Sequence, residues 1–108
     1  MAKATFGLDE NVAAALSYLL GVISGLVFLL AEKKNAFVRF HAAQSIVTFL
    51  SLAILSIIFG LVPFAGVAFS ALLSIVALVL WVVLMYKAYK GEKYKLPIVG
   101  DMVEKWLK

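Results

Sequence analysis

Apolar residues run in three long stretches along the chain, and charged residues stand at or near their ends. The stretches cover residues 12–31, 42–62 and 66–88, and the only charge inside them is Lys87. A helix of about 20 residues reaches about 30 Å, the thickness of the hydrocarbon core of a bilayer. The pattern therefore predicts an all-α integral membrane protein with three transmembrane helices.

A tight reversal is expected between the second and third stretches. The connecting sequence is GLVPFAG, from Gly60 to Gly66. Pro63 has no backbone N–H and ends a helix, and the flanking glycines permit a sharp turn. The two stretches should therefore form an antiparallel hairpin.

The tail predicts a short amphipathic helix over residues 97–107, beginning at Pro97, which suits the first helical turn. Its apolar half should lie in the bilayer interface with Trp106 near the headgroups, or else fold back over the ends of the bundle. The expected interfacial residues are Pro97, Ile98, Met102 and Trp106.

Composition agrees with a single membrane domain over residues 1–108. The chain is 65% hydrophobic and 15% charged, and a soluble chain this short cannot bury so much apolar surface. The chain has no cysteine, which excludes thiolate chemistry. A cleaved signal peptide is not expected from the first stretch, because its apolar run exceeds the usual length.

Charge predicts the orientation. With three spans, Lys3 lies on one side, and nine basic residues of the first loop and the tail lie on the other. The positive-inside rule then places a multi-pass protein in the cell membrane with its N-terminus outside and its C-terminus in the cytoplasm. The net charge of +4 indicates anionic lipid headgroups rather than nucleic acid as a partner.

Small residues recur at steps of about four on two stretches, as in helix-packing motifs of membrane proteins. They indicate either the seam of a homo-oligomer or packing among the three helices of one chain. The residues are Ala13, Ser17, Gly21 and Gly25 on the first stretch and Gly66, Ser70 and Ser74 on the third.

The second stretch carries a polar stripe, which should face the other helices because lipid leaves polar groups unpaired. The stripe can provide interhelical hydrogen bonds, or it can line a polar cavity in an oligomer. Its members are His41, Gln44, Ser45, Thr48 and Ser56.

The densest polar cluster is FVRFHAAQS, from Phe37 to Ser45. One interpretation is that Arg39 anchors the helix end while His41 and Gln44 bond neighbouring backbone. The other is a contact with a lipid headgroup or a protein partner. The candidate contact residues are Phe37, Arg39, His41, Gln44 and Ser45.

Catalysis finds little support in the sequence. No carboxylate lies within a span, the single histidine cannot form a metal cluster, and no Gly-rich phosphate loop is present. We therefore expect no enzymatic activity, no catalytic residue, no cofactor and no metal.

Three segments carry a family resemblance: DENVAAALSYLLG, KNAFVRFHAAQS and YKGEKYKLPIVGD. Together they resemble a prokaryotic family of small membrane proteins catalogued as a domain of unknown function. Its distant relatives are the chloroplast inner-envelope Tic import component, which is longer and has a further span, and the magnetosome proteins MamF and MmsF. The matching residues are Phe37, Arg39, Phe40, His41, Gln44, Ser45, Gly91, Leu96, Pro97 and Gly100.

The resemblance implies a three-helix domain with no assigned enzymatic activity, and MamF and MmsF suggest self-associating membrane proteins. The leading hypothesis is a non-enzymatic membrane scaffold or assembly factor that acts through helix packing and a basic cytoplasmic face. It implies a homo-oligomer or a membrane protein partner. The alternative is a subunit of a small oligomeric channel or a protein-translocation component.

Overall fold

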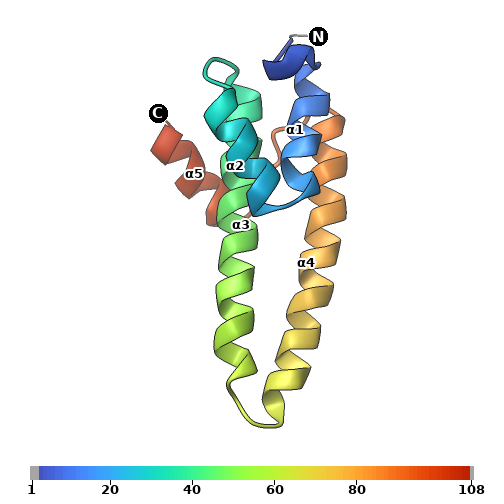
Figure 1. Cartoon of the computed structure of the whole chain (residues 1–108), viewed down its shortest axis with the longest axis vertical. Coiled ribbons are helices and arrows are strands. Elements are labelled where there is room, and N and C mark those ends of the chain that lie inside the picture. Colours follow the sequence, from blue (N-terminus) through green and yellow to red (C-terminus); the bar gives the residue numbers. More distant parts are fainter. Residues whose placement is uncertain (1–2, 108) are drawn as a thin grey trace.

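The computed structural model describes residues 3–107 and shows an elongated, all-helical molecule with extents of 49 × 24 × 21 Å (Figure 1). Five α-helices follow a short 3-10 turn over Thr5–Gly7, and no strand occurs in the described part of the chain. The predicted all-α class is confirmed. The number of membrane-length helices differs from the prediction.

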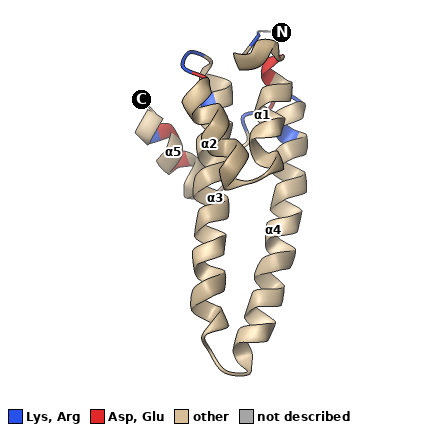
Figure 2. Ribbon diagram, in the orientation of Figure 1, with Lys and Arg blue, Asp and Glu red and all other residues tan. Residues whose placement is uncertain are grey.

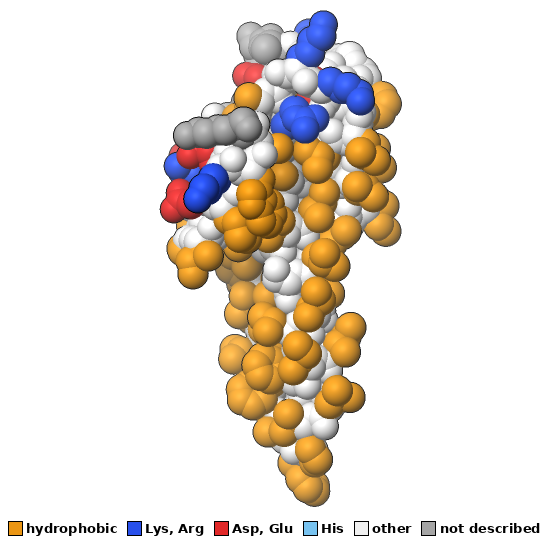
Figure 3. All heavy atoms as spheres, turned by 90° about the vertical axis from the view of Figure 1, so that its left-hand side faces the viewer, with side chains coloured by type: hydrophobic (Ala, Val, Ile, Leu, Met, Phe, Trp, Pro, Cys, Tyr) orange, Lys and Arg blue, Asp and Glu red, His pale blue; other side chains and the backbone are white. Residues whose placement is uncertain are grey.

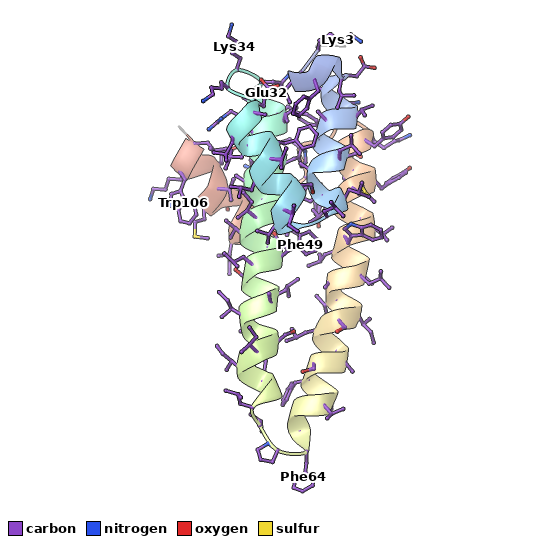
Figure 4. The ribbon with its side chains drawn as sticks, viewed as in Figure 1. Lys3, Glu32, Lys34, Phe49, Phe64 and Trp106 are labelled. Carbon is purple, nitrogen blue, oxygen red and sulfur yellow. The ribbon has the colours of Figure 1, made fainter. Side chains whose placement is uncertain are left out.

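The long axis of the molecule is an antiparallel hairpin of α3 (Ala36–Gly60) and α4 (Ala65–Tyr89). Each helix has 25 residues and is long and apolar enough to cross a membrane. The predicted stretches 42–62 and 66–88 are thus helical over almost all of their length. Phe64 lies at the tip of the hairpin, where 97% of it is exposed (Figure 4).

The prediction of one continuous span over residues 12–31 is wrong. The chain forms two helices of 10 residues, α1 (Glu10–Leu19) and α2 (Val22–Ala31), and reverses between them at Gly21, whose φ is +61°. Each helix is only about 15 Å long, half of the hydrocarbon thickness. The two lie beside the upper half of α3 and α4 and do not extend along the lower half (Figure 1).

Because of this reversal, the N-terminal segment lies at the same end of the molecule as the α2–α3 loop, whereas three spans would place the two at opposite ends. The backbone N–H of Thr5 donates to Oε1 of Glu32 over 2.6 Å, so the segment lies against the α2–α3 loop. Described charged residues from the N-terminal segment, the loop and the tail therefore gather at one end of the molecule (Figure 2). The whole segment 42–86 carries no charge.

The tail returns to the flank of α3 as α5 (Val99–Leu107). Val103 is buried there against Phe40, with Val99 and Leu107 beside it. The helix begins two residues later than predicted, because Ile98 takes a left-handed conformation at φ +70°. Ile98 and Trp106 are 80% and 65% exposed, and Trp106 points away from the long helices (Figure 4).

The surface divides sharply along the long axis. Figure 3, which faces α5, shows hydrophobic atoms from the level of α5 down to the tip and basic side chains only at the upper end. The lower half of α3 and α4 exposes large apolar side chains such as Ile57, Ile58 and Val67. Exposed apolar surface of this extent is typical of contact with lipid.

Candidate functional site

The charged half of the molecule contains a buried hydrogen-bond network centred on α1 and α3. The Tyr18 hydroxyl lies 2.6 Å from Nδ1 of His41, and Nε2 of Gln44 donates to the same hydroxyl over 3.0 Å. All three side chains are fully buried. Three aromatic rings surround the imidazole edge-on, with Phe37 as the nearest at 4.7 Å between ring centroids.

The partners define the tautomer of His41. Nε2 lies 3.0 Å from the carbonyl oxygen of Glu92, which can only accept, so Nε2 carries the proton. Nδ1 is then the acceptor, and the Tyr18 hydroxyl donates to it. A neutral imidazole therefore satisfies both contacts, and the network is complete without a ligand.

The same two side chains of α3 hold the chain that follows α4. His41 donates to the carbonyl of Glu92, and Gln44 donates to the carbonyl of Tyr94 over 2.9 Å. Oε1 of Gln44 accepts from the N–H of Leu96 over 3.0 Å. Three successive alternate residues of an extended segment are thus fastened to one helix face, and this positions α5.

A second set of contacts satisfies the turn between α1 and α2. The Trp81 indole N–H donates to the carbonyl of Leu19, and the Ser45 hydroxyl donates to the carbonyl of Gly21. Oγ of Ser24 accepts from the N–H of Leu20. Non-helical backbone at membrane depth is tolerated only where such partners exist. Side chains of α2, α3 and α4 supply them.

A third set joins α2 to α3 at the charged end. Nη1 of Arg39 donates to the carbonyls of Leu29 and Glu32, which are free carbonyls at the end of α2. The Glu32 carboxylate accepts backbone N–H groups, including that of Asn35 over 3.0 Å. These hydrogen bonds, with that of Asn35 the most effective, lower the pKa of Glu32 below its usual value.

The structure brings the candidate contact residues together but turns most of them inward. His41, Gln44 and Ser45 are buried and bonded within one chain, and Phe37 is half-buried against His41. Arg39 remains partly exposed at the charged end. Three members of the polar stripe, His41, Gln44 and Ser45, therefore bond to α1, to the α1–α2 turn and to the tail of the same chain. Of the other two, Thr48 is buried with no hydrogen-bond partner among the described residues, and Ser56 is half-buried.

The small residues of the first stretch lie between helices of the same chain. Ala13 and Ser17 are fully buried, and a Cβ on Gly25 would approach the carbonyl oxygen of Ala42 to 2.9 Å. On α4, a Cβ on Gly66 would meet the carbonyl oxygen of Phe59 at 2.6 Å. The remaining two residues of the α4 stripe are less enclosed: Ser70 is half-buried and Ser74 is exposed.

Sequence reasoning missed several residues of these networks. Tyr18 could have been found from the sequence, since the hydroxyl of a lone tyrosine in an apolar run needs a hydrogen-bond partner when it is buried. Ser24 and Trp81 carried the same kind of signal. Glu32 gave no comparable signal, because only the fold brings three N–H groups to its carboxylate.

Comparison with known proteins places the chain among small membrane proteins. The model of the magnetosome magnetite crystal formation protein family, MamF_MmsF, matches residues 8–103. The chain belongs to the MamF/MmsF family. The resemblance found from the three sequence segments is thereby confirmed.

Related chains in the MamF/MmsF family include proteins of two archaea, each named UPF0132 membrane protein. One from Methanocaldococcus jannaschii is 52% identical over 106 residues, which are 98% of this chain and 96% of the relative. One from Archaeoglobus fulgidus is 50% identical over 97 residues, which are 90% and 94% of the two chains. No solved structure matches this chain.

The charged end of this MamF/MmsF protein carries a pocket between the α2–α3 loop, the start of α3, and α5. Lys33, Lys34, Arg39 and Lys93 line it, with Glu104 as its one acidic side chain. No group of three or more His, Asp or Glu side chains within residues 3–107 is placed to hold a metal ion. The four cations around one carboxylate give the pocket a positive lining.

Proposed function

We propose that this MamF/MmsF protein is a non-enzymatic membrane scaffold whose helices occupy more cross-section in one leaflet of the bilayer than in the other. The proposal rests on where α1, α2 and α5 lie along the α3–α4 hairpin. These helices flank only the charged half of the α3–α4 hairpin (Figure 1).

The proposed placement in the bilayer follows from the division of the surface. The uncharged segment 42–86 contains most of both long helices, and from Ala42 to Gly60 it is long enough to reach through about 28 Å of hydrocarbon. The charged end then lies at the bilayer surface. The α1–α2 hairpin enters from that surface, turns at half depth and returns.

We propose that the charged end faces the cytoplasm. The N-terminal segment, the α2–α3 loop, the first turn of α3, the last turn of α4 and the tail share this end, and they carry every lysine and arginine of the described chain. The positive-inside rule then assigns a two-span protein of the cell membrane with both termini inside. This replaces the outside N-terminus that three spans required.

In this placement the protein is wedge-shaped, with its wider part in the leaflet beside the charged end. A helix with its side chains is about 10 Å wide, so α1 and α2 add roughly 160 Å² of cross-section to one leaflet. The exposed apolar side chains of Ile98 and Trp106 on α5 add to the same leaflet at the interface. Expansion of one leaflet bends a bilayer so that the charged face lies on the convex side.

Protein sorting on curved membranes tests the proposal. The purified chain is reconstituted into giant vesicles, and thin tethers are pulled from them. Molecules with the charged end outward, identified by labelling of a Thr5→Cys variant, should be enriched on the tether. Ile98→Ser with Trp106→Ser should reduce the enrichment while α3 and α4 stay inserted. Equal density on tether and vesicle would contradict the proposal.

Assembly with other chains belongs to the same proposal. The small residues of α1 and α2 are used inside the chain, so a second copy or a membrane partner would pack on the lower half of α3 and α4. A shallow apolar groove at the level of the α1–α2 turn, lined by residues 20–23 together with Phe49, Ser74 and Trp81, adjoins that part of the surface. Crosslinking in native membranes should yield a dimer or a stable heteromer, and free monomer alone would count against assembly.

A further inference from the structure

The strongest feature outside the buried networks is the basic pocket at the charged end. Its volume is about 370 Å³, and it lies between the α2–α3 loop and α5. Lys33 and Lys34 come from the loop, Arg39 from the first turns of α3, and Lys93 from the segment that His41 and Gln44 fasten. Three parts of the fold thus bring four cations to one place.

The charges in this pocket are not balanced. Glu104 is the only carboxylate in the lining, and it already accepts from Lys93 over 2.8 Å and from Lys95 over 3.2 Å. Lys33 and Lys34 form no ion pair with the residues that the structure describes. The pocket therefore keeps an excess of positive charge, which favours an anion.

Two of the cations are held in position before any ligand arrives. Nη1 of Arg39 is fixed by the carbonyls of Leu29 and Glu32, at 3.0 and 2.6 Å. The ammonium of Lys93 lies 4.8 Å from the centre of the Phe40 ring. Preorganised cations lose less entropy on binding an anion than free surface lysines do.

The pocket also has an apolar wall. Phe40, Ala36 and Leu107 line it together with the cations. A phosphate joined to an apolar chain fits both parts, because arginine and lysine bind phosphate oxygens while the wall receives the first carbons of the chain. Basic pockets beside membrane helices bind anionic lipid headgroups in this way.

We propose that this pocket binds the phosphate of an anionic phospholipid whose acyl chains run down the apolar surface of α3 beside α5. The inference rests on the bilayer placement proposed above, which puts the pocket at headgroup level. It goes beyond a general attraction of basic residues to the membrane, because it names one site and its residues.

Lipid retention by the full chain in a neutral detergent tests this inference. Native mass spectrometry compares bound phosphatidylglycerol with bound phosphatidylcholine for the wild type, for Lys33→Gln with Lys34→Gln, and for a control, Lys87→Gln with Lys90→Gln. The control removes the same charge from the same end but outside the pocket lining. Melting curves confirm that all three proteins are folded.

The pocket variant should bind phosphatidylglycerol about 30-fold more weakly than the wild type, since each lysine near an anionic lipid contributes about 1 kcal/mol. The control should stay close to wild type. Equal loss in both variants would overturn the inference. Inorganic phosphate bound as tightly as the lipid would overturn the lipid assignment. Because the assay needs no bilayer, these outcomes do not depend on the curvature result.

Discussion

The hydroxyl of Tyr18 on α1 donates to Nδ1 of His41 on α3 over 2.6 Å, in a part of the molecule where neither side chain is exposed. This contact joins the α1–α2 hairpin to the α3–α4 hairpin. Gln44 extends it to the segment after α4. One buried network therefore fixes three parts of the chain that are distant in sequence.

The Tyr18–His41 contact should be measurable as a coupling energy. Tyr18→Phe and His41→Ala each remove a hydrogen bond from a buried site, and the double variant should be less destabilised than the sum of the two. We expect a coupling of about 0.5–2 kcal/mol in reversible unfolding in detergent. Strict additivity of the two changes would contradict a direct bond.

The turn between α1 and α2 depends on Ser24, whose hydroxyl accepts from the N–H of Leu20 and donates to the carbonyl of Ser17. Ser24→Ala leaves both groups without that partner at a buried site and should lower the free energy of unfolding by about 1–2 kcal/mol. Ser74→Ala, at an exposed position of α4, is the matched control and should change little.

Gly25 and Gly60 provide a second matched pair. A Cβ on Gly25 would meet the backbone of α3 at 2.9 Å, whereas a Cβ on Gly60 comes no nearer than 3.8 Å to the Ser70 hydroxyl. Gly25→Ala should destabilise the protein by about 1–3 kcal/mol, because the α2–α3 contact must open. Gly60→Ala should be neutral or slightly stabilising. Thermal unfolding in detergent compares the two.

Single cysteines test the bilayer placement. Thr5→Cys and Lys34→Cys should react with a membrane-impermeant reagent from the cytoplasmic side, and Phe64→Cys only from the opposite side. Leu20→Cys, at the re-entrant turn, should be protected from both sides. Labelling of positions 5 and 34 from opposite sides would restore the three-span topology and contradict the re-entrant hairpin.

The packing of α5 against the rest of the molecule should weaken at acid pH. Hydrogen bonds from Lys93 and then Lys95 hold the pKa of Glu104 at about 2, below its ordinary value of 4.5. A lowered pKa means that the carboxylate stabilises the fold fully above pH 4.5 and loses this effect as the pH falls through about 2. Spin labels on Ala36→Cys and Lys105→Cys should move apart over this range.

Glu104→Gln is the control for that experiment. It removes the titrating group, so the distance between the labels should be larger at neutral pH and should change less on acidification. An unchanged acid transition in this variant would assign the effect to another group.

The second and third stretches were correctly predicted as helices, because each is a run of about 20 uncharged residues and Pro63 separates the two. Such a run has few alternatives to a membrane-length helix. The prediction was wrong for the first stretch, because the mean hydropathy of a stretch does not indicate whether the chain reverses within it. Gly21 is a common residue in transmembrane helices, so it gave no warning of a reversal. The backbone can reverse there only because Ser45 and Trp81, far along the chain, satisfy its carbonyls.

At the candidate site, too, the sequence predicted some features and only the fold revealed the others. The sequence identified His41 and Gln44 as polar groups that need partners, and it offered the bonding of nearby backbone as one interpretation. It could not find their partners, since Tyr18 and Tyr94 lie 23 or more residues away along the chain.

By itself, the sequence determined that the chain is all-helical, that lipid must cover much of its surface, and that charge is confined to the ends of the apolar runs. These properties follow from composition and periodicity, which are local. Only the tertiary structure decided that α1 and α2 turn back, that all the described charges meet at one end, and that four cations share a pocket. Those arrangements rest on contacts between distant residues, and such contacts have no signature in any single stretch of the chain.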